Sequence, residues 1–125
     1  METIAPNIFV DDLNATVEFY KLLGFTVVAS VPDEQGNNIF VMMQNGTVIV
    51  MFQTFRSIEN TLPAISRQNG GSLLLYIKMK NIRAFFEQVK GKVNVLTGLE
   101  KTFYGATEFS IVDINNYMLT FAEDE

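Results

Sequence analysis

The chain has 125 residues, a formal charge of −5 and a hydrophobic content of 48%. A chain of this length and composition can bury the core of one domain without disulfides or a structural metal. It contains no cysteine and no histidine, which excludes a thiolate nucleophile, a cysteine zinc site and any imidazole ligand or base.

The charge pattern and the apolar runs argue against two classes of partner. Nine basic residues are scattered along an acidic chain, which argues against nucleic-acid binding. The longest apolar runs, residues 39–43 and 48–52, are far shorter than the roughly 18 residues of a membrane span. The start, "METIAPNIF", has no basic segment that leads into an apolar one. We therefore expect a cytoplasmic protein without a nucleic-acid or membrane partner.

The first half of the chain predicts the element order strand, helix, strand, strand, strand. Alternation in "TIAPNIFV" indicates a strand, and "DDLNATVEFYKLLGF" has helical spacing after an aspartate that can cap the first turn. Gly24 is placed to end that helix. Three strands are then predicted in "FTVVASV", "IFVMMQ" and "TVIVMFQ", with a hairpin turn at Asn45 and Gly46.

The second half predicts the same order after an irregular connection. Residues 54–72 lose the pattern, and "RQNGGS" indicates a flexible link with room for a short helical turn around Ile65. A strand in "SLLLYIKM", a helix in "NIRAFFEQVK" and strands near "VNVLTGL", "TEFSIV" and "YMLTFAE" follow.

A shift of 69 residues superimposes the two halves. Besides placing Asp12 on Asn81, it pairs identical residues at five positions: Ala15 with Ala84, Glu18 with Glu87, Lys21 with Lys90, Phe40 with Phe109 and Phe52 with Phe121. The common offset and the matching element order favour an internal duplication. We expect one domain over residues 1–125, with module 1 at about 1–54, a connection at about 55–71 and module 2 at about 72–125.

Two motifs carry a resemblance to a known family. "VDDLNATVEFYKLLGF" resembles the V-x-D-L-x-x-A-x-x-F-Y-x-x-L-G-F signature of the vicinal oxygen chelate superfamily, which includes glyoxalase I, the extradiol dioxygenases and the bleomycin-resistance proteins. "YGATEFSIVDINNYMLTFAE" is similar to its W-G-x-x-x-F-x-x-x-D-P-x-G-N-x-x-x-F-x-E pattern, with Ile114 in place of proline and Asn116 in place of glycine. Asparagine tolerates a left-handed backbone, so we expect the turn to be kept.

The resemblance implies an α+β fold in which two βαβββ modules form a curled mixed-sheet cup, in a homodimer. Helices would cover the outer faces of the sheets. From strand alternation we infer the residues that point toward the helices and make the core: Ile4, Ile8, Val10, Leu75, Ile77, Leu119 and Phe121.

The resemblance also implies where a metal would be bound. The metal-dependent members use residues of the first and last strand of each module, and these positions correspond here to Ala5, Leu74, Thr120 and Met51, with Val50 as the alternative to Met51. Alanine and leucine offer no donor, and a thioether and a neutral hydroxyl are poor ligands for Zn²⁺, Ni²⁺ or Fe²⁺. We therefore expect no metal, no cofactor and no catalytic residue.

Strand alternation predicts the residues that line the cup. They are Asn7, Gln53, Tyr76, Lys78, Glu108 and Met118, to which the resemblance adds Ala5, Met51, Leu74 and Thr120 and the loop at residues 102–105 adds Tyr104. Phe9 and Ser110 share their face, and the aromatic rings of the two flanking loops lie near the mouth. A bland interpretation remains open for each: Lys78 as a solvated rim residue, Tyr104 as loop packing or a dimer contact, Thr120 as an ordinary strand residue and Glu108 as a solvated carboxylate.

The sequence leaves three functions open. The leading hypothesis is a metal-independent binding protein of the bleomycin-resistance-like type, which holds a small organic molecule, aromatic or cationic, in its cup. The second is a lyase, isomerase or dioxygenase with a non-standard site, for example a metal held by Glu108 with Gln53, or a carboxylate that acts alone. The third is an interaction module whose cup is filled by side chains.

Overall fold

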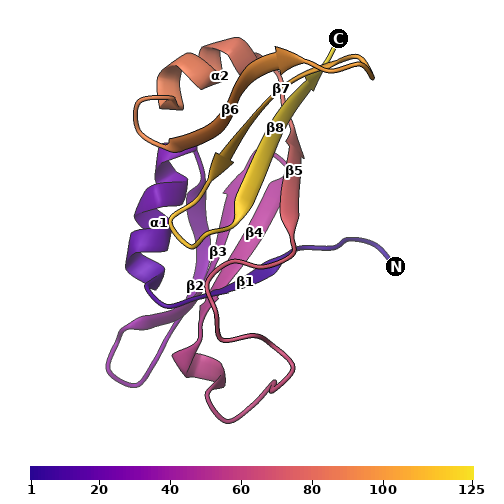
Figure 1. Cartoon of the computed structure of the whole chain (residues 1–125). Coiled ribbons are helices and arrows are strands. Elements are labelled where there is room, and N and C mark those ends of the chain that lie inside the picture. The colour runs from indigo at the N-terminus through magenta and orange to yellow at the C-terminus, as the bar shows by residue number, and fades with distance from the viewer. The chain divides into compact units, whose positions relative to one another are not determined.

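Each half of the chain folds in the order strand, helix, strand, strand, strand (Figure 1). The computed structural model describes all residues, 1–125, and divides into two compact units, Met1–Asn69 and Gly70–Glu125. The first unit contains β1 (Asn7–Val10), α1 (Leu13–Leu22), β2 (Thr26–Pro32), β3 (Asn38–Asn45), β4 (Val48–Thr54) and the 3₁₀ helix η1 (Arg56–Ile58). The second contains β5 (Leu74–Lys78), α2 (Ile82–Val89), β6 (Asn94–Lys101), β7 (Ala106–Val112) and β8 (Met118–Asp124).

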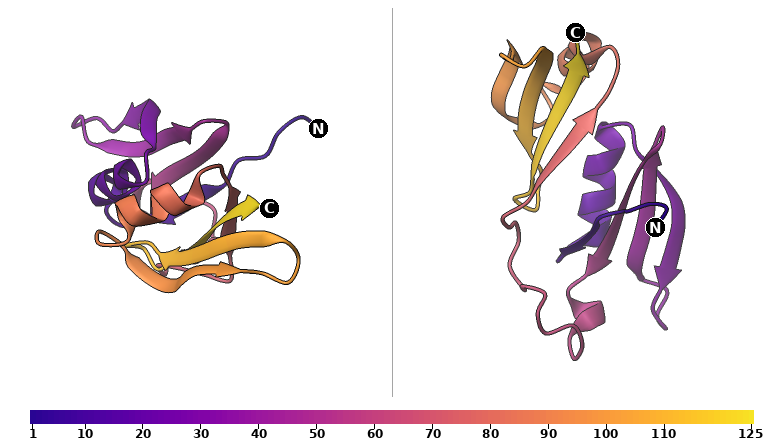
Figure 2. Two further views of the ribbon diagram at one scale, coloured as in Figure 1. Left: turned by 90° about the horizontal axis from the view of Figure 1, so that it is seen from above. Right: turned by 90° about the vertical axis from the view of Figure 1, so that its right-hand side faces the viewer.

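Each unit is a four-stranded mixed sheet with one helix against one face (Figure 2). The strand orders are β1-β4-β3-β2 and β5-β8-β7-β6. The first strand of each unit is parallel to the last, and the other neighbours are antiparallel. The predicted α+β fold of two βαβββ modules is thereby confirmed. No helix of the chain is long and apolar enough to cross a membrane.

The helix of the first unit is capped by its own sequence. The side chain of Asp12 accepts a hydrogen bond of 2.9 Å from the amide of Ala15, which satisfies one free donor of the first turn. Gly24, at φ +92°, follows the last turn with a left-handed backbone. Tyr20 is fully buried, and its ring packs against Phe52 at 4.6 Å between centroids. The helix thus buries its apolar side on the sheet.

The helix of the second unit is capped by a residue from β8. Asn81 has a left-handed backbone (φ +60°) and makes no capping bond with its side chain. The carboxylate of Glu123 accepts hydrogen bonds from the amides of Asn81 and Ile82, at 3.1 and 3.0 Å. Beneath the helix, Phe109 stacks on Phe121 with ring centroids 5.1 Å apart. The cap and the aromatic core both tie α2 to the strand that carries Thr120 and Glu123.

The strand registers of the two units agree with the duplication. The parallel pair Asn7 with Met51 in β1 and β4 corresponds to the pair Tyr76 with Thr120 in β5 and β8, at the offset of 69 residues. Both edge pairings, β2 with β3 and β6 with β7, also contain two register shifts, and the first shift lies at corresponding residues, 27–29 and 95–97. Irregularities of this kind bend a strand locally, so the two units share one of these irregular positions.

The 69-residue shift pairs Phe40 with Phe109, but these two residues are not structurally equivalent. Phe40 pairs with Gln53, whereas Phe109 pairs with Phe121, so the structural equivalent of Phe40 is Glu108. The chain between equivalent register pairs is one residue longer in the second unit, because Gln44 pairs with Ile49 whereas Val112 pairs with Met118. Because strand side chains alternate between faces, a slip of one residue moves Phe109 to the helix side while Phe40 lies on the opposite face.

The predicted helices and strands are found, but the first strand is shorter than predicted and the connection contains a 3₁₀ helix. The first strand begins at Asn7 and excludes residues 3–6, so Ile4 is 97% exposed and its prediction as a core residue is wrong. Ile8, Val10, Leu119 and Phe121 are buried as predicted, while Leu75 and Ile77 are half-buried. In the connection, η1 is followed by hydrogen-bonded turns from Ile58 to Thr61 and from Leu62 to Ile65. The expected left-handed backbone at Asn116 is present, with φ +67°.

Candidate functional site

The face of each sheet that points away from its own helix carries the predicted lining residues. In the first unit the strand alternation places Asn7, Phe9, Met51 and Gln53 on this face, which we call the open face of the unit. In the second unit the open face carries Leu74, Tyr76, Lys78, Glu108, Ser110, Met118 and Thr120. Ala5 precedes β1 and belongs to no strand.

The four positions at which the resemblance would place metal ligands do not fit a divalent cation. Ala5 and Leu74 have no donor atom, and Met51 offers only a thioether. Met51 pairs with Asn7 as Thr120 pairs with Tyr76, so Met51 and not Val50 is the equivalent of Thr120. Nowhere in the chain do three acidic, histidine or cysteine side chains gather in a way that could hold a metal ion.

Thr120 is bonded to a neighbour across the strand pair. Its hydroxyl oxygen lies 2.8 Å from the hydroxyl oxygen of Ser110, its register partner on β7. Thr120 is 6% exposed and Ser110 is 9% exposed. A buried hydroxyl needs a partner, and this pair satisfies both hydroxyls within the sheet. The residue at the ligand position is therefore part of a buried side-chain hydrogen bond.

Two tyrosines converge on one carboxylate of the second unit. The hydroxyls of Tyr76 on β5 and Tyr104 in the β6–β7 turn each donate a hydrogen bond of 2.5 Å to Oε2 of Glu108 on β7. The register sets Glu108 beside Ala122, which is buried and has a small side chain. Tyr76 therefore reaches Glu108 diagonally across β8. We call these three side chains the Tyr-Glu-Tyr cluster.

The hydrogen bonds of the cluster change the acidity of both phenols. The bond to Glu108 is the main reason that the pKa of Tyr76 and the pKa of Tyr104 are raised, and partial desolvation and the negative charge of Glu108 act in the same direction. Both hydroxyls thus remain protonated donors at neutral pH. Oε1 of Glu108 receives no hydrogen bond from the chain, because both donors bind the other oxygen.

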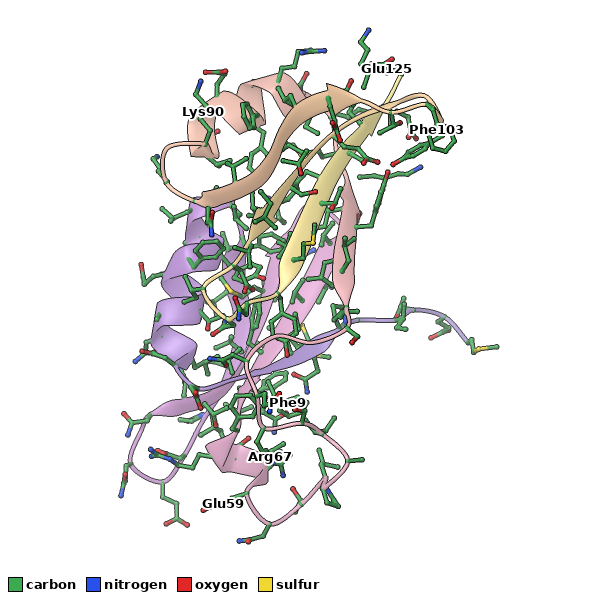
Figure 3. The ribbon with its side chains drawn as sticks, viewed as in Figure 1. Phe9, Glu59, Arg67, Lys90, Phe103 and Glu125 are labelled. Carbon is green, nitrogen blue, oxygen red and sulfur yellow. The ribbon has the colours of Figure 1, made fainter.

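The turn that supplies Tyr104 is held by its own hydrogen bonds. The hydroxyl of Thr102 accepts a bond of 3.0 Å from the amide of Ala106, and Gly105 turns the chain at φ +86°. Phe103, at the tip of this turn (Figure 3), is fully exposed and packs edge-to-face on Tyr104, with centroids 5.0 Å apart. The turn places two aromatic rings at the end of the open face.

The other polar candidates each have a partner within their own unit. Lys78 forms an ion pair of 3.0 Å with Asp124, and both side chains are well exposed. The amide of Asn7 donates to Gln53 at 3.0 Å, and Gln53 donates to Ser57 at 2.9 Å. These contacts fix the orientation of the Asn7 and Gln53 amides on the open face of the first unit.

The structure groups the predicted residues unevenly. It joins Tyr76, Tyr104 and Glu108 by hydrogen bonds, pairs Leu74 with Met118 and Tyr76 with Thr120 in register, and joins Asn7 with Gln53. Sequence reasoning missed the role of Ser110 as the partner of Thr120 and did not consider Glu100, which lies opposite Glu108 in the β6–β7 pairing. The register of the β6–β7 hairpin is the signal that would have found Glu100.

Solved structures share this fold along the whole chain. A protein of unknown function from Agrobacterium tumefaciens has 26% identity and a TM-score of 0.78, with 100% of this chain and 95% of that chain covered. A glyoxalase/bleomycin resistance protein/dioxygenase from Nocardioides has 19% identity and a TM-score of 0.78, with 99% and 84% covered. A bleomycin-binding protein in complex with bleomycin has 20% identity and a TM-score of 0.65, with both chains covered fully, at 100%.

None of the curated proteins matches the chain. The family model described as Glyoxalase/Bleomycin resistance protein/Dioxygenase superfamily matches residues 3–121, which include all of α1 and α2 and nearly all of the two sheets. The chain therefore belongs to the glyoxalase/bleomycin resistance protein/dioxygenase superfamily.

Proposed function

We propose that this chain is a metal-independent binding protein for a small organic molecule and that it acts as a cytoplasmic homodimer. The observation that carries the proposal is the set of residues at the expected ligand positions: Ala5, Met51, Leu74 and Thr120. Ala5, Met51 and Leu74 lack a strong donor atom, and the hydroxyl of Thr120 is hydrogen-bonded to Ser110. The fold is kept while the side chains that would bind a metal are absent.

The open faces have the character of a site for an organic ligand. Such sites are mostly apolar and contain a few oriented polar groups. On the first unit, the apolar groups are Phe9 and Met51, and the oriented ones are the bonded amides of Asn7 and Gln53. Methionine adapts its shape to irregular ligands. This mixture supports a binding role for the face.

The second unit adds Leu74 and Met118 as apolar contacts and the Tyr-Glu-Tyr cluster as a polar one. Hydrogen-bonded side chains lose little further freedom when a ligand binds, which favours affinity. The solved bleomycin-binding protein, which has the same fold, was found in complex with bleomycin. Its ligand supports a binding role for this chain but does not identify the compound.

Thermal denaturation of the purified protein with a library of small organic compounds tests the proposal. A compound present at 100 times its dissociation constant stabilises the folded state by about 2.7 kcal/mol, and the midpoint rises with concentration. Sedimentation velocity of the same samples measures the dimer. A broad library without any shift in the midpoint argues against a small-molecule ligand and favours the interaction module.

Elemental analysis separates the proposal from the enzymatic alternative. We expect less than stoichiometric nickel, zinc and iron after dialysis, and the same denaturation midpoint with and without a chelator. Stoichiometric metal, or a midpoint that falls when the metal is removed, would establish a non-standard metal site and overturn metal independence.

A further inference from the structure

Glu108 of the Tyr-Glu-Tyr cluster lies in a row of residues that crosses the sheet of the second unit. The row runs from Lys78 through Ala122 and Glu108 to Glu100, because these residues are register partners on β5, β8, β7 and β6. It places two carboxylates directly opposite each other at the β6–β7 pairing. Like charges in this position are destabilising, so a bound cation would relieve an unfavourable contact.

No basic side chain of the chain neutralises the two carboxylates. Lys78, the cation of the row, is paired with Asp124 at 3.0 Å. Neither Glu100 nor Glu108 takes part in an ion pair. Oε2 of Glu108 is occupied by two phenol hydrogens, and Oε1 is open to a further donor. The carboxylate is oriented by the protein and has one oxygen to offer.

Aromatic rings surround this carboxylate on the side of the β6–β7 turn. Tyr76 is 44% exposed and Tyr104 is 57% exposed. Phe103, which packs on Tyr104, is fully exposed at the tip of the turn (Figure 3). Ring faces attract cations, and the attraction favours cations that lose their hydration easily. An organic ammonium or amidinium meets this condition better than a small metal ion, for which the site supplies too few donors.

We propose that the Tyr-Glu-Tyr cluster recognises an organic cation, an ammonium or amidinium group, which donates to Oε1 of Glu108 and contacts the exposed aromatic rings of the cluster. This inference rests on the proposed small-molecule function and specifies the chemical class of the ligand. Tyr76 and Tyr104 act as positioning groups that hold the carboxylate, and their neutral hydroxyls leave its negative charge in place.

Isothermal titration calorimetry with matched ligand pairs tests the proposal. The probes are benzamidinium and its neutral near-isostere benzamide, and benzylammonium and its neutral analogue benzyl alcohol. We expect each cation to bind the native protein more tightly than its neutral partner, and the difference to shrink as salt is added. Glu108→Gln keeps the shape of the side chain and removes its charge. It should weaken benzamidinium binding about tenfold to a hundredfold, as expected for loss of a charge-assisted hydrogen bond.

Glu87→Gln serves as the matched control. Glu87 lies on α2 and is ion-paired with Lys90, so this variant changes the net charge by the same amount away from the cluster. Its benzamidinium affinity should stay within about twofold of the native value. Far-UV circular dichroism and the thermal midpoint establish that both variants are folded.

The outcomes separate this inference from the proposed function. Neutral probes that bind as well as the cations, or benzamidinium affinity that Glu108→Gln leaves unchanged, would overturn the cation site and leave the binding function intact. Equal losses in Glu87→Gln and Glu108→Gln would show a general charge effect and also overturn the site. Failure of the cations together with the whole library in the thermal assay would overturn both.

Discussion

The buried hydroxyl pair of the second unit predicts a specific pattern of stability changes. Thr120→Val keeps the shape of the side chain but leaves the hydroxyl of Ser110 without its partner at 2.8 Å. Ser110→Ala leaves the hydroxyl of Thr120 without its partner. An unsatisfied buried polar group costs about 1–3 kcal/mol, whereas replacing both partners by apolar groups is close to neutral. Because both residues are at most 9% exposed, water cannot restore much of the lost bond.

We therefore expect each single variant to lose about 1–2 kcal/mol of unfolding free energy and the double variant to lose less than the sum of the two. Urea denaturation at constant m-value measures this, and for m of about 1–3 kcal/mol/M a loss of about 1.5 kcal/mol moves the midpoint by about 0.5–1.5 M.

Thr26→Val is the matched control for this cycle. Thr26 lies on the edge strand β2, is exposed, and has only a long contact of 3.5 Å to the carbonyl of Gln44. The same substitution there should change stability by no more than about 0.5 kcal/mol. Single-variant losses that add within about 0.5 kcal/mol in the double variant would refute the buried pair. Thr120 would then be an ordinary strand residue with an independent hydroxyl.

Three further changes test other parts of the fold. Hydrogen bonds from the amides of Ile82 and Asn81 lower the pKa of Glu123 below its ordinary value of 4.5. The charge of Glu123 therefore stabilises the fold above pH 4.5, and this contribution is lost as the pH falls through the lower pKa of the folded state. In urea titrations, Glu123→Gln should lose less stability between pH 6 and pH 3 than the native protein. Gly70→Ala should destabilise more than Gly36→Ala, because both have φ above +80° but only the first would bring a Cβ to 2.7 Å from the carbonyl oxygen of Asn116; equal denaturation midpoints would contradict the close approach. Arg67→Lys should speed proteolysis within residues 58–67, because the guanidinium donates to four carbonyls of this loop; unchanged cleavage rates would show that the loop is held by other contacts.

The element order could be predicted because local signals in the sequence, such as helix caps and turn residues, agree with the folded structure. Asp12 caps α1 as its position before the periodic segment predicts, and Gly24 ends that helix with a left-handed backbone. The hairpin at Asn45 and Gly46 forms where the turn residues indicate it. Such signals lie within a few residues of each other, so the sequence alone could specify them.

The faces of individual residues were harder to predict because they depend on strand register. The identity of Phe40 and Phe109 supported a single offset for the whole repeat, but the longer turn before β8 shifts β7 by one residue. Ile4 continued the alternation of β1 in the sequence, yet the parallel pairing with β4 begins only at Asn7. Periodicity cannot reveal where the partner strand ends, because that limit is set by residues far along the chain.

The sequence predicted the residues of the candidate site but not the hydrogen bonds that join them. Tyr76, Tyr104 and Glu108 were each placed near the open face, and the bland alternative for Glu108 was a solvated carboxylate. The hydrogen bond from Tyr76 to Glu108 crosses β8 above the small side chain of Ala122, whereas the bond from Tyr104 comes from four residues earlier in the chain. A contact between residues on next-but-one strands has no local signature in a sequence, since it depends on two registers at once.

The one-residue slip between the two units has a consequence for the site. At the offset that fits β7, the equivalent of Glu108 in the first unit is Phe40, and the equivalent of Ser110 is Met42. The open face of the first unit therefore presents an aromatic ring and thioethers where that of the second presents a carboxylate and hydroxyls. Under the proposed metal-independent function, neither face has to keep the donors of a metal site. The proposals then assign apolar contact to the first face and recognition of a cation to the second.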